Sequence, residues 1–482
     1  MKSAKGKDIL IDSVFVLLGA MILCYWMWFN GFVFFYGDSG GYITRSFNGQ
    51  VSHHWAMFYS LFIKLTSLSW SLIGVAVAQN IIISWLIFRL IRLIVGSCWH
   101  NRIALVSVVL ILNFSSTLPW ISNMMMSDVF TGVGMSSLIL LFYEKMKGPS
   151  FWFALLLFVS GVIAHKSHKP IIGIEMLILS CIYLIYVWKF SLGSWKDGGL
   201  RIVIIWTAFF LGLMLLVPAI NTMMAREEVI KKEVSANESL LKTAKSEYHF
   251  VWRALQRVGV YDEMLEEYCP TRQYVFLCDK PRMDRLGEDG YWNDLKKGGL
   301  LTEEVEDITK AAMMDSEYII PVISEGFNRG MKMSRNYRIP IRHKSIRSPK
   351  RLKSVFRPFS QDEVLYKNSC IALGIKMMRI KQMLQKPNGF ILRFWIIFYL
   401  ILLVLIRITI WKNVGKERLW NMFFVSSSLI GGYYINCFLM ATFGNLGNPR
   451  YPTRVSWMVI LGLLLLSAFL VDGIYRKKQQ RL

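Results

Sequence analysis

Long apolar runs separated by short polar segments dominate the chain. Runs of about 15–25 residues recur, and a run of that length can cross a hydrocarbon core of roughly 30 Å as a helix. We therefore predict an all-α polytopic membrane protein with about ten transmembrane helices, within a range of eight to eleven. The predicted spans are residues 13–35, 73–95, 103–120, 124–143, 151–164, 170–189, 201–220, 388–410, 419–443 and 453–473.

One long polar region interrupts these runs and divides the chain into three parts. We predict an N-terminal transmembrane block (1–220), an exported domain (221–387) and a C-terminal transmembrane block (388–482). Amphipathic stretches such as LTEEVEDITKAAMMDSEYIIPVI predict that the exported domain is mainly helical. Its two cysteines, Cys269 and Cys278, are candidates for a disulfide if the compartment is oxidising, and free thiols are the open alternative.

Composition and charge fix the class of protein and its orientation. The chain is 54% hydrophobic, above the usual share of a soluble protein, and its first run is too long for a cleavable signal peptide. Basic residues of the short loops fall on the side of both termini, which the positive-inside rule places in the cytoplasm. We expect a bacterial inner (plasma) membrane, with residues 221–387 outside. The cations on the side of the termini include Lys2, Lys5, Lys7, Arg89, Arg92, Arg102, Lys145, Lys147, Lys196, Arg201, Arg407, Lys412, Lys416, Arg418, Arg476, Lys477, Lys478 and Arg481.

The net charge of +24 therefore needs no nucleic-acid partner. One basic stretch, residues 329–358, lies in the exported domain and holds eleven Lys and Arg without an acid. Two interpretations stay open for it: a face resting on lipid headgroups, or a contribution to the phosphate site of an anionic substrate.

The run GDSGG, residues 37–41, matches the surroundings of the nucleophilic serine in trypsin-like proteases. No histidine precedes Ser39, and the residues before it are mostly apolar, so the base and its orienting carboxylate are missing. The protease interpretation fails. The glycines predict a turn after the first span, and the residue of interest becomes Asp38.

Four predicted outer loops gather ionisable residues on one side of the membrane. Such groups at the edge of an apolar bundle are costly and usually line a cavity that holds water or substrate. Each residue also has a plain alternative: Asp38 and Asp128 can cap helices, and the cations can face lipid headgroups. The candidates are Asp38, Tyr42, Arg45, His53, His54, Asp128, His165, Lys166, His168, Lys169, Arg450, Tyr451 and Arg454.

The order of these motifs resembles the GT-C superfamily of membrane glycosyltransferases, which use polyprenyl-phosphate-linked sugars. The stretch GDSGGYITRSFNGQVSHHWAMFYSLFIKL resembles the family's first outer loop, with Asp38 at its acidic position. MMMSDVFTGVGMSSLILLF resembles the start of a later span with a second acid, here Asp128, and NPRYPTRVSWMVIL resembles the family's late turn. The resemblance covers the first 200 residues and the last 40. Prolines of the interfacial helix and a paired acidic motif are absent, which leaves dependence on a divalent metal open.

The resemblance implies an inverting transfer of a sugar from a polyprenyl-phosphate donor to a lipid or cell-surface glycan acceptor. Asp38 would take the proton of the acceptor hydroxyl, and Asp128 would orient the acceptor or a neighbouring cation. Fixed cations would stabilise the departing phosphate. The implied substrate-binding residues are Tyr42, His53, His54, His165, Lys166, His168, Lys169, Arg450, Tyr451 and Arg454.

Three other functions remain open from the sequence. A flippase or exporter of a lipid-linked substrate is the main alternative, although transporters usually carry charges deep in their spans and show internal repeats. A membrane-anchored assembly factor would bind a protein through the exported domain. A ligase that moves a whole glycan needs the same base and phosphate site as a single-sugar transferase.

Overall fold

The computed structural model is almost entirely helical, as the apolar runs predict. It describes residues 2–36, 38–48, 57–95, 98–143, 148–165, 167–190, 195–224, 254–255, 258–272, 300–335, 356, 359–369, 377–411, 414–443 and 450–480. Within these ranges there is no strand beyond one isolated bridge. A helix satisfies its own backbone hydrogen bonds, which a segment surrounded by lipid requires.

Seven helical segments are long and apolar enough to cross a membrane. Three shorter apolar helices occupy the remaining predicted spans: α6 (Cys98–Ser115), α8 (Val129–Tyr143) and α9 (Pro149–Ile163). The chain is thus a multi-pass membrane protein by length and composition, and the count of ten spans stays a prediction. The seven long segments are Lys7–Asn30, Ile73–Ile94, His168–Ile185, Leu200–Ile220, Gly389–Thr409, Arg418–Thr442 and Tyr451–Gln479.

These segments belong to helices that often extend beyond the apolar stretch. The first is α1 (Lys2–Leu23) continued by α2 (Tyr25–Asn30), and a π-helical turn, η1 (Gly212–Leu216), joins two helices in the fourth. The other helices are α5 (Ile73–Ile94), α10 (His168–Phe190), α11 (Trp195–Leu211), α12 (Val217–Met224), α21 (Met377–Thr409), α22 (Lys416–Phe443) and α24 (Trp457–Gln479).

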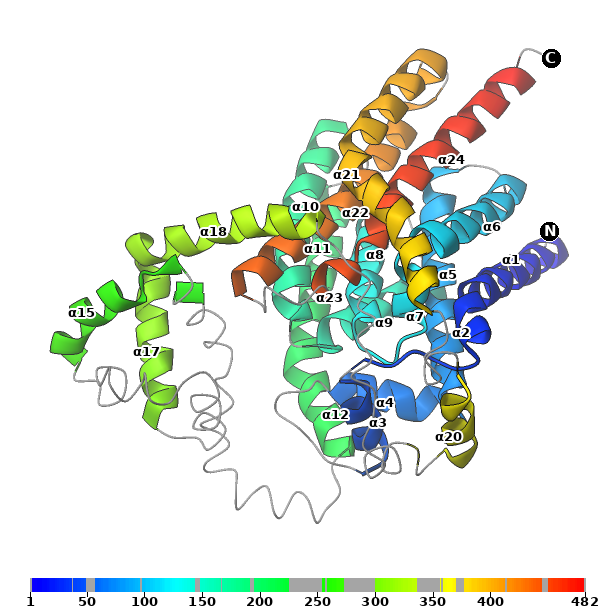
Figure 1. Ribbon diagram of the computed structural model, residues 1–482. Helices are drawn as coiled ribbons and strands as arrows, with labels where there is room; N and C mark the ends of the chain where they lie inside the picture. Colours follow the sequence, from blue (N-terminus) through cyan, green and yellow to red (C-terminus); the bar gives the residue numbers. More distant parts are fainter. Residues whose placement is uncertain are drawn as a thin grey trace.

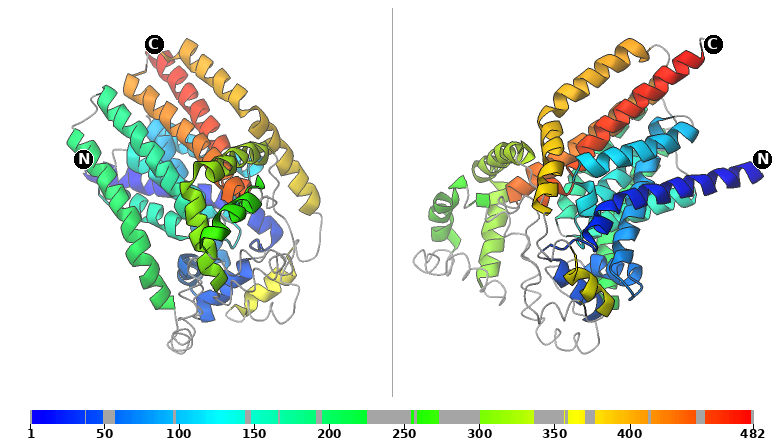
Figure 2. Two further views of the ribbon diagram at one scale, coloured as in Figure 1. Left: turned by 90° about the vertical axis from the view of Figure 1, so that its left-hand side faces the viewer. Right: turned by 45° about the vertical axis from the view of Figure 1, so that its right-hand side comes forward.

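Both termini project from one end of the bundle, which we call the termini end (Figures 1 and 2). Ion pairs tie the helix ends together there. Arg102 of α6 contacts Asp8 and Asp12 of α1, at 2.9 and 2.8 Å, and His100 contacts Asp472 of α24 at 3.1 Å. Direct contacts therefore support the predicted grouping of these helix ends on one side. Which face of the membrane this side occupies stays a prediction.

The opposite end, the loop end, holds the segments that join the spans. Phe34 and Met124 form a parallel bridge, in which Phe34 N–H donates to Asn123 O and Met125 N–H donates to Phe34 O. The residues before α8 are therefore irregular, and the predicted start of a span at residue 124 is wrong by about one turn. The backbone of 123–125 pairs with the first loop, which removes it from a helix.

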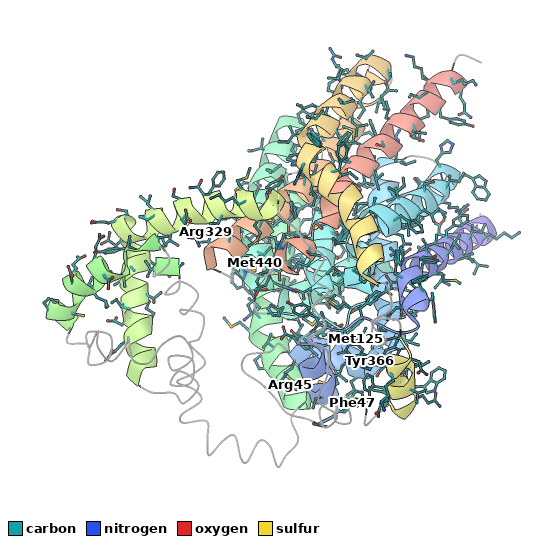
Figure 3. The ribbon with its side chains drawn as sticks, viewed as in Figure 1. Arg45, Phe47, Met125, Arg329, Tyr366 and Met440 are labelled. Carbon is teal, nitrogen blue, oxygen red and sulfur yellow. The ribbon has the colours of Figure 1, made fainter. Side chains whose placement is uncertain are left out.

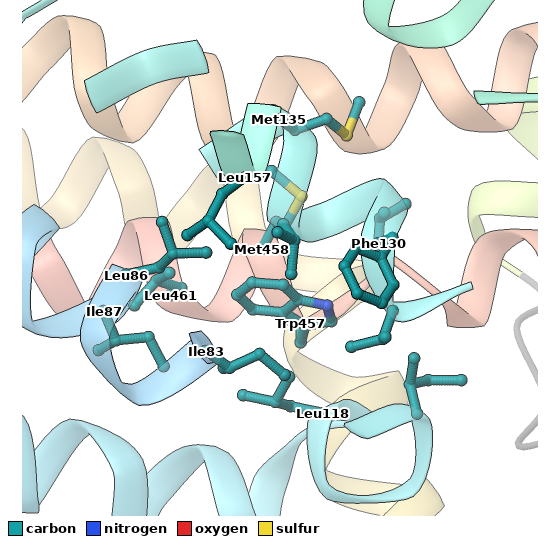
Figure 4. Close-up of a cluster of buried hydrophobic side chains, with 14 of the residues drawn as sticks. Ile83, Leu86, Ile87, Leu118, Phe130, Met135, Leu157, Trp457, Met458 and Leu461 are labelled. Atoms are coloured by element: carbon teal, nitrogen blue, oxygen red, sulfur yellow. The ribbon is translucent and has the colours of Figure 1, made fainter. Parts of the chain in front are cut away.

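The middle of the bundle is α8, every residue of which is buried. It approaches α9 so closely that a Cβ on Gly161 would lie 2.4 Å from Gly134 Cα, so glycine is required at this crossing. Trp457, at the start of α24, lies against α8 at Gly132, and Figure 4 shows it among aliphatic side chains from several helices. This packing fixes the segment just before Trp457.

Described helices of the predicted exported domain extend from the loop end in Figure 1: α15 (Tyr261–Arg272), α17 (Leu300–Met314) and α18 (Ser316–Arg335). Another, α20 (Ser360–Lys367), lies against the bundle. The longest, α18, docks on α22: Gly330 lies against the backbone of Phe438, and Tyr433 Oη–H donates to Ser334 O at 2.8 Å. Figure 3 shows the same contact, with Arg329 of α18 close to Met440 of α22.

The second docking point is α20. Its Asp362 accepts hydrogen bonds from Ser71 Oγ and from the backbone N–H of Leu72, both at 2.7 Å, immediately before α5. Tyr366 of α20 packs edge-on against Phe35 of the first loop. A disulfide was predicted between Cys269 and Cys278. Cys269 is disulfide-bonded, and Cys278 lies outside the described residues. Most of the basic stretch 329–358 also lies outside them.

Candidate functional site

Asp38 lies directly before α3 (Ser39–Asn48), the first helix after the first span. Its backbone carbonyl accepts from the N–H groups of Gly41 and Tyr42, and Ser39 Oγ accepts from Tyr36 N–H at 2.8 Å. Ser39 is buried at the start of α3. The predicted glycine turn is wrong for Gly40 and Gly41, which lie within the helix, and Gly37 lies outside the described residues. The Asp38 side chain is half-buried at the start of α3.

Tyr42 connects this first loop to the second. Its hydroxyl lies 2.9 Å from Ser127 Oγ, and its ring packs edge-on against Tyr59 of α4 (Met57–Thr66). Asp38, directly before α3, lies four residues ahead of Tyr42, and its backbone carbonyl accepts from the Tyr42 N–H. The hydrogen bond between Tyr42 and Ser127 therefore links α3, which begins directly after the predicted base Asp38, to the residue preceding Asp128.

Asp128 and Arg454 form a buried ion pair across the loop end, with 3.5 Å between Arg454 Nη1 and Asp128 Oδ1. Their side chains are 1% and 0% exposed, although they are far apart in sequence. The resemblance implied that Asp128 orients the acceptor or a neighbouring cation, and the structure places it against the cation.

The guanidinium of Arg454 has two further partners. Nε and Nη2 both donate to Asn436 Oδ1 of α22, at 2.9 and 2.8 Å, and Nη1 donates to Ser167 Oγ at 3.1 Å. Asn436 in turn donates to the carbonyl of Tyr451 at 2.8 Å. Arg454 is therefore held by α22 and by the second and third loops of the loop end, and its side chain is fully buried.

The two described histidines of the third loop differ in their surroundings. His168 is completely buried, with Nδ1 2.8 Å from Gly161 O and Nε2 2.7 Å from Thr131 Oγ1. A carbonyl only accepts, so Nδ1 carries the proton, and in the neutral ring Nε2 accepts from the threonine hydroxyl. His168 fixes α10 to α8 and α9.

His165 is half-buried and lies next to Ser167. Its Nδ1 accepts from the backbone N–H of Ser167 at 3.1 Å and lies 2.8 Å from the hydroxyl of that serine. The same hydroxyl oxygen receives the hydrogen bond from Arg454, so Ser167 connects His165 to the buried ion pair. In the neutral ring, the proton of His165 then resides on Nε2.

The described site thus has a buried floor and a half-buried rim. The floor contains Tyr42, Asp128, His168 and Arg454, whereas Asp38, His165, Lys169 and Tyr451 are half-buried. Arg45, one turn beyond Tyr42, has its pKa lowered by burial, with the interaction with Tyr42 acting in the opposite direction. His53, His54 and Lys166 lie outside the described residues, as does the side chain of Arg450, whose backbone begins α23 (Arg450–Thr453).

Sequence reasoning missed the neutral partners that hold the floor together: Ser127, Thr131, Ser167 and Asn436. One signal was present for Asn436, because it is an amide in the apolar run GGYYINCFLM and such residues usually bond to a neighbouring helix. The sequence carried no such signal for Ser127, Thr131 or Ser167. No group of three His, Cys, Asp or Glu that could hold a metal ion occurs in the part of the chain that the structure describes.

The sequence matches no protein-family model, and comparisons with curated proteins and with solved structures give no match either.

Proposed function

We propose that the chain is an inverting membrane glycosyltransferase that moves a sugar from a polyprenyl-phosphate donor to a lipid or cell-surface glycan. The observation that supports this proposal is the meeting of four loops at one buried point. Tyr42 joins the first loop to the second, and Arg454 joins the last to the second and third. Residues that the resemblance assigns to one reaction therefore lie at one end of the bundle.

The half-buried rim is the part of the site that can reach a substrate. In this proposal Asp38 accepts the proton of the acceptor hydroxyl as that oxygen attacks the anomeric carbon. The bond from the sugar to the phosphate oxygen breaks, and the phosphate departs with the electron pair. His165, Lys169 and Arg450 offer donors and positive charge to that phosphate.

The buried floor has a different role in the proposal. Asp128 partly neutralises Arg454, and Ser167 links this pair to His165. These contacts hold the third loop in place, so that His165 meets the phosphate without reorganisation. Preorganisation of this kind lowers the cost of stabilising charge at the moment of reaction. We therefore assign Arg454 as a positioning residue, with Asp38 as the catalytic base.

The test is glycan analysis by mass spectrometry in cells that lack the gene and receive a variant copy. Asp38→Asn keeps the size of the side chain and removes the base. Asp262→Asn makes the same change on an exposed residue of α15 and serves as the matched control. We expect the control to restore the missing sugar and Asp38→Asn to leave it missing at equal membrane levels. Full restoration of the sugar by Asp38→Asn would overturn the assignment of Asp38 as the catalytic base.

A second candidate function, a flippase or exporter of a lipid-linked substrate, is favoured by Glu175. This residue of α10 is fully buried near Gly432 of α22, and neither carboxyl oxygen has a hydrogen-bond partner among the described residues. It lies seven residues beyond His168, about 10 Å into the bundle. Ionisable groups inside spans often mark transport pathways.

The same cells separate the two functions. A flippase predicts that a complete lipid-linked glycan accumulates on the cytoplasmic face, and that Glu175→Gln reproduces this accumulation whereas Asp38→Asn does not. The transferase predicts a glycan that lacks one sugar, with Asp38→Asn as the severe variant.

A further inference from the structure

A basic pocket lies at the termini end, remote from the loop-end site. It has a volume of about 360 Å³ and is bordered by the first turns of α22 and the last turns of α24. Three cations line it together with two amide side chains, and no acidic residue is among the lining residues that the structure describes. These polar lining residues are Arg418, Asn421, Arg476, Lys477 and Gln480.

Hydrogen bonds to a buried carboxylate and to backbone carbonyls hold the three cations in place. The buried Asp472 accepts a hydrogen bond from Arg418 and another from Arg476, the latter at 3.0 Å. Arg418 also donates to Ile94 O at 2.8 Å, and Lys477 Nζ donates to Thr409 O at 2.9 Å. Arg418 and Arg476 therefore share the carboxylate of Asp472, whereas Lys477 is held by a backbone carbonyl.

Part of each arginine stays accessible. The Arg418 side chain is 22% exposed and that of Arg476 is 42% exposed, whereas that of Asp472 is only 2% exposed. The carboxylate thus fixes one edge of each guanidinium and leaves donors for a ligand. Guanidinium and ammonium groups around an amide-lined pocket suit the oxygens of a phosphate group.

The surroundings of the pocket are apolar and point outward. Ile408, near the end of α21, and Trp411, two residues beyond that helix, are exposed, as is Ile474 on α24. Arg407 lies over the ring of Trp411, 5.1 Å from its centroid, an arrangement typical of the membrane interface. A ligand in the pocket would have hydrocarbon chains beside it and water above it.

We propose that this pocket binds the phosphate group of an anionic ligand, and that the ligand is the headgroup of an anionic phospholipid. The charge of the pocket selects phosphate, and the exposed apolar helices next to it provide a surface for the acyl chains. Basic pockets between helix ends are a recurrent form of headgroup recognition. The proposal does not depend on the loop-end site.

The test is native mass spectrometry of the purified full-length protein in detergent. Phosphatidylglycerol, phosphatidylcholine and inorganic phosphate are added separately. We expect the protein to retain phosphatidylglycerol in preference to phosphatidylcholine. Lys477→Gln should weaken the binding of phosphatidylglycerol by about fivefold, the typical effect of one cation near a membrane surface on affinity. Inorganic phosphate bound as well as the lipid, or bound alone, would overturn the assignment to a lipid.

Lys478→Gln is the matched control, because Lys478 is the next residue of α24, is exposed, and does not line the pocket. A pocket predicts that only Lys477→Gln weakens binding, whereas a diffuse attraction to the surface predicts equal weakening in both. Equal weakening overturns the proposal. Thermal unfolding without lipid should be the same in both variants, which separates lost binding from lost folding.

Discussion

The two ends of the bundle use the same residue types in opposite ways. At the loop end one arginine, Arg454, lies against Asp128, and both are sealed from solvent. At the termini end two arginines share the buried Asp472, and each keeps part of its guanidinium in the open. The first arrangement locks loops together, and the second presents positive charge to a ligand. Burial of the cation, which the residue type does not reveal, separates these two roles.

The largest expected effect comes from removing one partner of the buried pair. Asp128→Asn leaves the Arg454 charge uncompensated in the interior, which typically costs about 3–5 kcal/mol. Thermal unfolding of the purified protein in detergent, or failure to accumulate in the membrane, would report it. The double variant Asp128→Asn with Arg454→Gln removes both charges and should recover part of the loss. An unchanged unfolding temperature would contradict the buried-pair interpretation.

Two glycines compare the packing of the α8–α9 crossing with that of the termini end. A Cβ on Gly161 meets the backbone of Gly134, whereas one on Gly473 meets the Cδ1 atom of Ile410, the end of a flexible side chain, each at 2.4 Å. We expect Gly161→Ala to cost about 1–3 kcal/mol and Gly473→Ala less than about 1 kcal/mol. The same unfolding assay measures both. A larger loss in Gly473→Ala would reverse the comparison.

Asp472→Asn is the counterpart of Asp128→Asn at the termini end. Its arginine partners can turn toward water, so we expect a loss of about 1–2 kcal/mol, between the values typical of exposed and of buried pairs. The variant should unfold at a lower temperature than the wild type and at a higher one than Asp128→Asn. Equal losses in the two variants would show that exposure of the cation does not matter.

The smallest effect concerns pH and Asp362, which ties α20 to the loop end. Burial raises the pKa of this carboxyl above its usual 3.8, and the hydrogen bonds from Leu72 and Ser71 oppose that rise. The folded state then holds the proton more tightly than the unfolded state. The contribution of Asp362 to the stability of the folded state is therefore complete below pH 3.8, and it is lost as pH rises through the pKa of this carboxyl in the folded state.

Asp362→Asn cannot titrate and isolates this contribution. The stability of the wild type relative to the variant should decline as pH increases from acid toward neutral. Unfolding temperatures of the two proteins across that range measure the difference. A difference that grows with pH would mean that the hydrogen bonds outweigh burial.

Much of the fold follows from the sequence because a bilayer imposes a strong requirement for hydropathy and length. All the predicted apolar ranges contain helices, and the ends of α1, α6 and α24 that carry predicted cytoplasmic cations contact one another. The errors lie where a distant segment decides the structure. Residues 124–126 are three methionines and apolar enough for a helix, yet the bridge between Phe34 and Met124 holds this segment in an irregular form.

The site was predictable in part for a related reason. Asp128, His165, His168 and Arg454 could be selected because charged residues at span ends are rare. Their division into floor and rim could not, since it depends on neutral partners such as Ser167 and Asn436. Arg454 is 18 residues from Asn436 and 287 from Ser167. No local pattern predicts contacts over such separations.

The long reach of the Asp128–Arg454 pair has a consequence for biosynthesis. The two residues are 326 positions apart (454 − 128). At roughly 5–20 residues per second, the ribosome delivers Arg454 on the order of half a minute after Asp128. During that interval Asp128, at the start of α8, lacks its contact with Arg454. Final closure of the loop end therefore waits for the segment directly before α24, so the last part of the chain to be made completes a contact that one of its first loops began.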